Sequence, residues 1–113
     1  MQVNKMTIPL TDEELMQEIE TFVKKYGVNP EYKGYKYICD IIFMAKKRKR
    51  YSRETIKNLA PEIASKYGIK ENSVQRQLRY AVTLKNMYGG KLLPVELVDL
   101  AYKNISLEKT VNI

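Results

Sequence analysis

One stretch constrains the fold more than any other: "LAPEIASKYGIKENSVQRQLRYAV", residues 59–82. Within it, a small residue, a glycine four residues later and a branched residue six further on stand at Ala64, Gly68 and Val74. A small residue lets two helices approach closely, glycine readily adopts the positive φ of a tight bend, and a branched residue anchors the second helix against the first. This spacing predicts a helix-turn-helix over about residues 60–86.

The apolar periodicity of the same stretch supports two packed helices. Apolar residues recur at the 3.6-residue period on both sides of the bend. One departure is Leu78, which comes one place later than the inward residue in the commonest form of the motif. With Ala60 as the first position of the motif, the other residues expected to face inward are Ile63, Tyr67, Ile69 and Val74.

The second helix of this motif should have a polar outer face. On a wheel of about 100° per residue, apolar side chains gather on one side and hydrogen-bonding side chains on the other. Arginine can donate two hydrogen bonds to guanine, and asparagine or glutamine can pair with adenine. This face could therefore read DNA bases, or it could be a solvated helix surface with salt bridges. The outer side chains are Asn72, Arg76, Arg79 and Thr83, with Gln75 on the flank and Tyr80 at the edge, where it could pack or touch a phosphate.

Positive charge is concentrated in the middle of the chain. The net charge is +7, but residues 32–91 alone carry 15 basic and 4 acidic side chains. Such a regional field suits a protein that binds a polyanion, although basic domains that only gain solubility from their charge are also common. A run of five basic residues could be a solvated loop, or it could contact nucleic-acid phosphates and strengthen binding without specifying sequence. The run consists of Lys46, Lys47, Arg48, Lys49 and Arg50.

Further helices are predicted on both sides of the motif. Thr11 and Glu14 form a capping-box pattern, which begins a helix that should end at Gly27. Residues 35–45 are apolar over most of a helical circumference, which indicates a central helix. Their Ile, Tyr and Phe also favour strands, but the length of the segment argues for a helix. Pro94 begins the last helix, "PVELVDLAYKN".

The remaining segments complete the predicted fold. Ser52 is a candidate N-cap, and Pro61 either begins a second helix or kinks one longer helix. Residues 88–91 predict a loop or hinge, and residues 106–113 predict a frayed tail. Since no convincing pair of strands is found, we expect a single all-α domain over residues 1–113, with five or six helices.

Composition excludes several classes of protein. Cys39 is the only cysteine and histidine is absent, so neither an internal disulfide nor a metal site is expected. No nucleophile–base pair can be assembled, which argues against an enzyme, and nothing indicates a cofactor or a small-molecule substrate. No apolar run approaches about 18 residues, and the N-terminus has no signal-peptide character. We therefore expect no membrane span and a cytoplasmic protein.

Two segments together resemble a known family. The segment "GYKYICDIIFMA" and the stretch at residues 59–82 are similar to the C-terminal DNA-binding domain of the stage-zero A sporulation response regulator family. That family has a Gly-Tyr-x-Tyr-Leu helix, a Tyr-Pro-x-Ile-Ala-x-Lys-Phe scaffold helix and a Ser-Arg-Val-Glu-Arg-x-Ile-Arg-x-Ala-Ile recognition helix. The leader "FVKKYGVNPEYKGY" is also similar, and the resemblance covers about residues 15–86.

The resemblance implies an all-helical domain that binds promoter DNA through its helix-turn-helix and regulates transcription in a spore-forming or related bacterium. In the family, a glutamate and two arginines of the recognition helix contact bases, and the corresponding residues here are Gln75, Arg76 and Arg79. Glutamate accepts from cytosine whereas glutamine prefers adenine, and an arginine of the family is replaced by Ser73, so the target site should differ. Further candidate DNA contacts are Lys70, Asn72, Ser73, Tyr80 and Thr83.

Two departures from the family shape the remaining expectations. No receiver domain is expected ahead of residue 1, and the segment before the last helix is shorter than in the family. The implied partner is double-stranded DNA. RNA polymerase and a second copy of the chain are further candidates. The shortened segment argues against carrying over the family's contacts with either of them. The alternative function is a helix-turn-helix-like protein-interaction module, a dimeriser or antagonist of a full-length regulator, which would lack the steep salt dependence of DNA binding. RNA binding is a third option.

Overall fold

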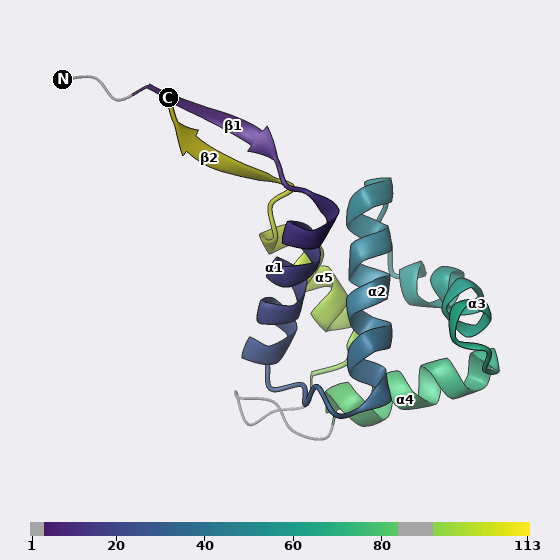
Figure 1. The fold of residues 1–113 in the computed structure, drawn as a ribbon. Coiled ribbons are helices and arrows are strands. Elements are labelled where there is room, and N and C mark those ends of the chain that lie inside the picture. Colours follow the sequence, from purple (N-terminus) through teal and green to yellow (C-terminus); the bar gives the residue numbers. More distant parts are fainter. Residues whose placement is uncertain (1–3, 84–91) are drawn as a thin grey trace.

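The computed structural model describes residues 4–83 and 92–113. Within them, five helices form the body and two short strands pair beside it, which confirms the prediction of a mostly α-helical fold. None of these helices is long and apolar enough to cross a membrane. The loop expected at residues 88–91 lies outside the described residues. In chain order the elements are β1 (Lys5–Pro9), α1 (Asp12–Lys25), α2 (Lys33–Arg48), α3 (Thr55–Tyr67), α4 (Glu71–Thr83), α5 (Pro94–Asn104) and β2 (Glu108–Asn112) (Figure 1).

The first helix, α1, begins and ends where the sequence predicts. The Thr11 hydroxyl accepts a hydrogen bond from the Glu14 backbone N–H at 3.1 Å, and the Glu14 carboxylate accepts one from the Thr11 N–H at 3.0 Å. This reciprocal pair is the predicted capping box. At the other end of the helix, Gly27 adopts a φ of 88°, which lets the chain leave the helical path.

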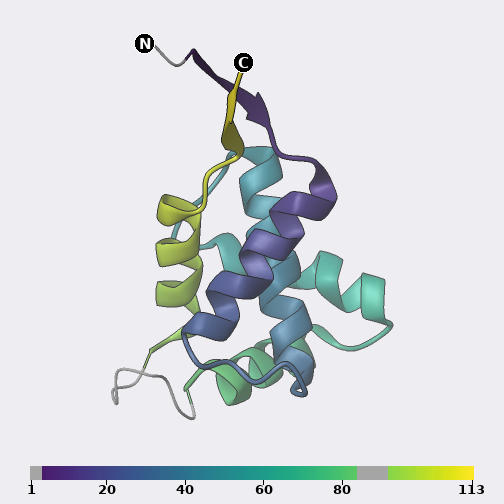
Figure 2. The same cartoon turned by 60° about the vertical axis from the view of Figure 1, so that its left-hand side comes forward.

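The central helix is α2, which contacts each of the other four described helices (Figures 1 and 2). Its broad apolar surface, which predicted this position, places Ile38, Ile41 and Ile42 fully inside the core. The helix is longer than predicted, since it covers Lys33–Arg48 rather than residues 35–45. The first three residues of the basic run therefore continue the helix, and the interpretation of that part as a solvated loop is wrong.

Gly34 allows α2 and α4 to pack closely. Gly34 lies in the first turn of α2. A Cβ atom at this position would sit 2.2 Å from the carbonyl oxygen of Gln77 and 2.7 Å from the Cβ of Ala81, both in α4. Only a residue without a side chain leaves room for the backbone of α4 at this crossing.

The structure resolves the two alternatives for Pro61. α3 runs continuously from Thr55 to Tyr67 with Pro61 inside, so the alternative of one longer helix is correct. The predicted N-cap is wrong, because Glu54 rather than Ser52 occupies the cap position. The Ser52 hydroxyl instead accepts a hydrogen bond from the Glu54 N–H at 3.1 Å and stabilises the turn that precedes the helix.

The strands β1 and β2 form an antiparallel ribbon that joins the two ends of the chain (Figure 1). The register pairs Lys5 with Asn112 and Pro9 with Glu108. The expectations of a frayed tail at residues 106–113 and of no strand pair are therefore wrong. Each strand is a short, mostly exposed segment whose partner lies at the other end of the chain, so local periodicity gives no signal for either.

Candidate nucleic-acid interface

The turn between α3 and α4 has the geometry that the sequence predicts. α3 ends at Gly68, whose φ is 66°, and the next N–H, that of Ile69, donates to the Ala64 carbonyl at 2.9 Å. Residues 68–70 separate the two helices. Ala64 is buried, and Val74 is fully buried in α4. Gly68 thus has the positive φ, and Ala64 and Val74 have the burial, that the sequence predicts.

The inner face of α4 packs into the core. α4 contacts α2, α3 and α5, so side chains on this face are enclosed by three helices. Leu78 is only 1% exposed, although it comes one place later than in the commonest form of the motif. This packing fixes the rotation of α4 about its own axis and turns its polar side outward. The buried residues of the face are Val74, Leu78, Ala81 and Val82.

A buried carboxylate in α2 holds the end of α3, and with it the turn. Asp40 accepts a hydrogen bond from the Tyr67 hydroxyl at 2.5 Å and forms an ion pair with Lys66 at 2.9 Å. Burial, followed by the hydrogen bond to Asp40, raises the pKa of Tyr67, so its hydroxyl stays protonated and remains a donor. Sequence reasoning missed Asp40, for which the available signal was a lone acidic residue within a run of core residues.

The outer face of α4 carries the predicted base-contacting residues. Arg76 and Arg79 are exposed, and Gln75 is half-buried on the flank. Arg76 donates a long hydrogen bond, 3.4 Å, to the Ser73 hydroxyl one turn earlier. Asn72 is exposed at the start of the same helix. The structure thus brings these predicted residues together on one helix whose opposite side is buried.

The other candidate contacts lie at the edges of this face. Lys70 is exposed immediately before α4. Tyr80 is 53% exposed, and its ring packs edge-on against that of Tyr32 with centroids 5.2 Å apart. Tyr80 therefore packs and remains accessible. Thr83 is the last residue of α4, and its side chain lies outside the described part of the structure.

A groove of about 290 Å³ beside α4, which we call the α4 groove, adds two cations to the site. Gln75 and Arg79 line it from α4, while Arg53 and Lys57 line it from the start of α3 and the turn before it. Sequence reasoning missed Arg53 and Lys57, because their charge does not distinguish them from the other basic residues of the central segment. Their spacing of four residues at the start of the first motif helix was the signal available.

The basic run lies at the end of α2 that is remote from α4. The start of α2 lies beside α4 (Figure 1), and the two helices pack most closely at Gly34. Lys46 is 12 residues further along α2, which is about 18 Å at a rise of about 1.5 Å per residue. Lys46 is buried, and its ammonium group donates to the carbonyl oxygens of Tyr102, at 2.9 Å, and of Ile105. Burial lowers its pKa. Lys46 therefore caps the last carbonyl groups of α5 and is not presented to a ligand.

The other four residues of the run are exposed. Lys47 forms an ion pair with Asp12 at 2.8 Å, and Arg48 forms a two-bond pair with Glu62, both bonds at 2.7 Å. The last two residues, by contrast, make no side-chain hydrogen bond or ion pair with the described residues. The run is thus divided between cations that hold helices together and cations that are available to a ligand.

A mostly helical fold that exposes arginine and asparagine along one helix, beside a groove lined by three cations, has the features of a nucleic-acid-binding domain. The family described as sporulation initiation factor Spo0A C terminal matches residues 19–111. The chain belongs to this family, which confirms the resemblance seen in the sequence. Its members are DNA-binding effector domains of a sporulation regulator. The chain is therefore a DNA-binding domain that acts in transcription regulation. No curated protein matches the chain.

Proposed function

We propose that this chain binds double-stranded DNA at specific sites and thereby regulates transcription, with α3 and α4 acting as a helix-turn-helix. In this arrangement α4 enters the major groove as the recognition helix, because its inner face is held in the core and its polar face is turned outward. The observation that carries the proposal is the joint exposure of Arg76 and Arg79 on α4, in a chain from a DNA-binding family.

Each side chain of the outer face has its own chemical role in the proposal. Arg76 and Arg79 donate paired hydrogen bonds to guanine, whereas Gln75 and Asn72 pair with adenine. The hydrogen bond from Arg76 to Ser73 restricts the arginine to conformations that point along the start of α4. The glutamine at position 75 favours adenine where a glutamate would favour cytosine, so the preferred site differs from that of the family at this base pair.

The α4 groove supplies contacts that do not depend on sequence. Lys57 lies at the start of α3 and Arg53 in the turn before it, and α3 is the helix that crosses the DNA backbone in a helix-turn-helix. In the proposed complex they bind phosphates on one side of α4, with Lys70 and Tyr80 as further backbone contacts. Such contacts set the position and orientation of α4, while the bases are read by its outer face.

The proposal is tested by selecting binding sites from a random duplex library and then measuring the double variant Arg76→Ala, Arg79→Ala. We expect the variant to lose its preference for the selected site over a scrambled duplex, by about 1–3 kcal/mol for each arginine. Its far-ultraviolet circular dichroism should be unchanged, because both side chains are exposed.

The matched control is the double variant Lys24→Ala, Lys25→Ala, which removes the same charge from the exposed end of α1. The control should keep the preference for the selected site. If the arginine variant binds that site as tightly as the wild type does, these arginines do not read bases.

The rival function, a protein-interaction module, predicts a different response to salt. DNA binding through several cations weakens steeply with salt because counterions are released from the duplex, whereas a protein-interaction module would show no such duplex binding. Repeating the selection at two salt concentrations separates the two functions.

In our proposal the protein acts in the cytoplasm, on the nucleoid. RNA polymerase and a second copy of the chain are the partners to test by sedimentation with the selected duplex.

A further inference from the structure

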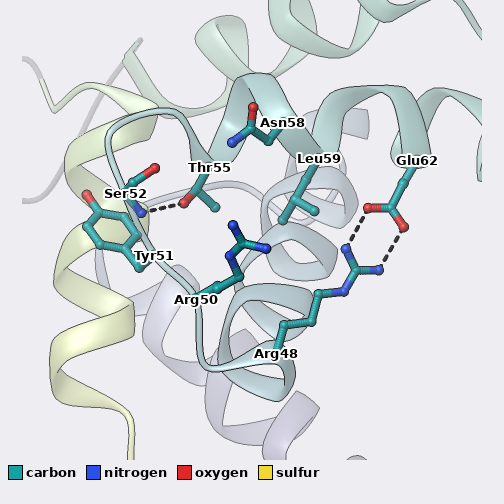
Figure 3. Close-up of a pocket in the computed structure, with 8 residues that line it drawn as sticks. All are labelled: Arg48, Arg50, Tyr51, Ser52, Thr55, Asn58, Leu59 and Glu62. Carbon is teal, nitrogen blue, oxygen red and sulfur yellow. Dashed lines mark hydrogen bonds and ion pairs between the residues drawn. The ribbon is translucent and has the colours of Figure 1, made fainter.

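A second pocket lies on another side of α3, between the end of α2 and the link that joins the two helices (Figure 3). Its volume is about 580 Å³, and it shares no lining residue with the α4 groove. The residues that α3 contributes also differ: Asn58 and Glu62 line this pocket, whereas Lys57 lines the α4 groove. A volume of several hundred Å³ is in the range that holds small organic ligands.

The backbone at the end of α2 directs Arg50 into this pocket. Lys49 adopts a positive φ of 53°, the conformation that ends a helix and that residues other than glycine rarely adopt. The Arg50 N–H then donates to the Ala45 carbonyl at 3.1 Å, which fixes the direction of the chain. Figure 3 shows the Arg50 guanidinium inside the ring of lining residues, and it has no hydrogen bond or ion pair with any described residue.

The only carboxylate that lines the pocket from the described residues is already occupied. Glu62 accepts two hydrogen bonds from Arg48, both at 2.7 Å, one on each oxygen (Figure 3). The hydrogen bonds from Arg48 hold the pKa of Glu62 below its ordinary value, so the pair stays ionised. Arg48 and Glu62 thus neutralise each other, and the positive charge of Arg50 remains uncompensated inside the pocket.

Uncharged hydrogen-bond donors surround Arg50. The side-chain amide of Asn58 has no partner among the described residues. The Thr55 hydroxyl oxygen accepts from the Ser52 N–H at 2.7 Å, and the Ser52 hydroxyl oxygen accepts from a backbone N–H, so each hydroxyl hydrogen remains available to a ligand. Among the described residues, the pocket therefore offers one guanidinium without an acidic partner, one amide and two hydroxyl donors. Each oxygen of the Glu62 carboxylate already accepts a hydrogen bond from Arg48.

We propose that this pocket binds a phosphate group, with Arg50 as the charged contact and Asn58, Ser52 and Thr55 as neutral donors. A phosphate has several acceptor oxygens, and a guanidinium matches its geometry with two parallel hydrogen bonds. The phosphate could be carried by a small molecule or by the backbone of DNA. The chemistry of the site is the same in both cases, and it does not depend on whether α4 reads bases.

Titration of the ¹⁵N-labelled protein with inorganic phosphate, at constant ionic strength, tests the proposal by nuclear magnetic resonance. We expect saturable shifts of the Arg50 Nε–H and of the Asn58 side-chain amide, and both should be lost in Arg50→Gln. The matched control is Lys49→Asn, which removes the same charge next to the pocket and keeps a residue that tolerates positive φ. The control should saturate as the wild type does.

The proposal is overturned if the wild type shows no saturable shifts at these groups, or if Arg50→Gln shows the same shifts as the wild type. Because the spectrum of each variant also reports whether it is folded, a loss caused by unfolding is recognised directly.

Duplex binding in phosphate-free buffer identifies the source of the phosphate. If the DNA backbone supplies it, Arg50→Gln should weaken duplex binding several-fold more than Lys49→Asn does. Equal weakening by the two variants, together with saturable binding of inorganic phosphate, assigns the pocket to a small phosphorylated molecule. Failure of the titration leaves the proposed DNA binding by α4 untouched, so the two proposals fail independently.

Discussion

Asp40 is a buried side chain that helps to position the turn between α3 and α4 at the surface of the molecule. It is buried in α2, and its two partners arrive from the last turn of α3. Burial of a carboxylate is unfavourable unless hydrogen bonds compensate for lost hydration. The sequence could not predict the burial of Asp40, because the compensating Tyr67 and Lys66 belong to another helix. This contact therefore helps to fix the position of the turn that follows Tyr67.

Replacing Asp40 with alanine should therefore destabilise the fold. The Tyr67 hydroxyl would lose its acceptor in a half-buried position, at a cost of about 1–3 kcal/mol in the free energy of unfolding. Urea denaturation followed by circular dichroism measures this loss. Lys66→Ala removes only the exposed partner and should cost about 0–1 kcal/mol. Equal stability of Asp40→Ala and the wild type would contradict the role assigned to this carboxylate.

The buried hydroxyl of Tyr35 and the buried thiol of Cys39, one turn apart in α2, should make the fold sensitive to alkaline pH. Burial raises the pKa of Cys39 from 9.0 to about 12 and that of Tyr35 from 10.0 to about 12. The unfolded chain releases these protons first, so it binds fewer protons than the folded chain at alkaline pH. Their contribution to stability is therefore complete below about pH 9 and is lost as the pH rises toward about 12.

Urea midpoints at about pH 7 and about pH 10.5 measure this loss. The variant Cys39→Val lacks the thiol and should lose less stability between the two values than the wild type does. Should both proteins lose the same amount, the thiol of Cys39 does not contribute to the alkaline sensitivity.

At the level of helices, the elements with local signals were predicted and the contacts between them were not. The capping box at Thr11, the apolar surface of α2 and the turn at Gly68 are all encoded within a few residues, and the structure has each of them. The role of Gly34 is not local, because it depends on where the backbone of α4 passes. The burial of Lys46 depends in the same way on the end of α5.

Alanine substitutions at two glycines should separate a steric requirement from a backbone requirement. Gly34→Ala forces a Cβ into the α4 backbone and should cost about 1–3 kcal/mol or more, with loss of affinity for DNA as α4 moves. Gly68→Ala meets no atom within 4 Å and should cost about 1–2 kcal/mol, from its positive φ alone. Thermal denaturation and duplex binding of the two variants make the comparison.

Asparagine substitutions provide the control for this pair. Gly68→Asn should recover part of the stability that Gly68→Ala loses, because asparagine tolerates positive φ. Gly34→Asn should recover nothing, since no side chain fits at the crossing. Recovery at position 34 would contradict the close contact with α4.

Across the whole molecule, the positive charge of the central segment is divided between two uses. Lys46 and Lys47 bind α5 and α1, and thus hold the body together. Arg76 is exposed on α4, and Arg53, Lys57 and Arg79 line the α4 groove, which together form the surface proposed to bind DNA. The sequence predicted the outer face of α4 because one helical period generates it. It could not predict the α4 groove, which three helices form together.

The salt dependence of duplex binding should report how many cations of the α4 groove meet phosphates. Removing Arg53 and Lys57 by alanine substitution should reduce the slope of log affinity against log salt by about 2, at about 0.9 for each lost phosphate contact. The selected base sequence should stay the same, since these residues bind phosphates and not bases in the proposed complex. The variant Lys24→Ala, Lys25→Ala should keep the wild-type slope, and an unchanged slope in the groove variant would place Arg53 and Lys57 outside the interface.

The terminal ribbon brings the two ends of the chain together, and the Ile113 N–H donates to the Asn4 carbonyl at 3.1 Å. The ribbon projects from the end of the body opposite to α4 (Figure 1). A short peptide linker could therefore join the two strands by a small loop at this end. New termini could then be introduced at another point of the chain, which gives a circular permutant. Such a permutant would keep every helix–helix contact in the body, and a surface-tethered version held by that loop would present α4 freely to DNA.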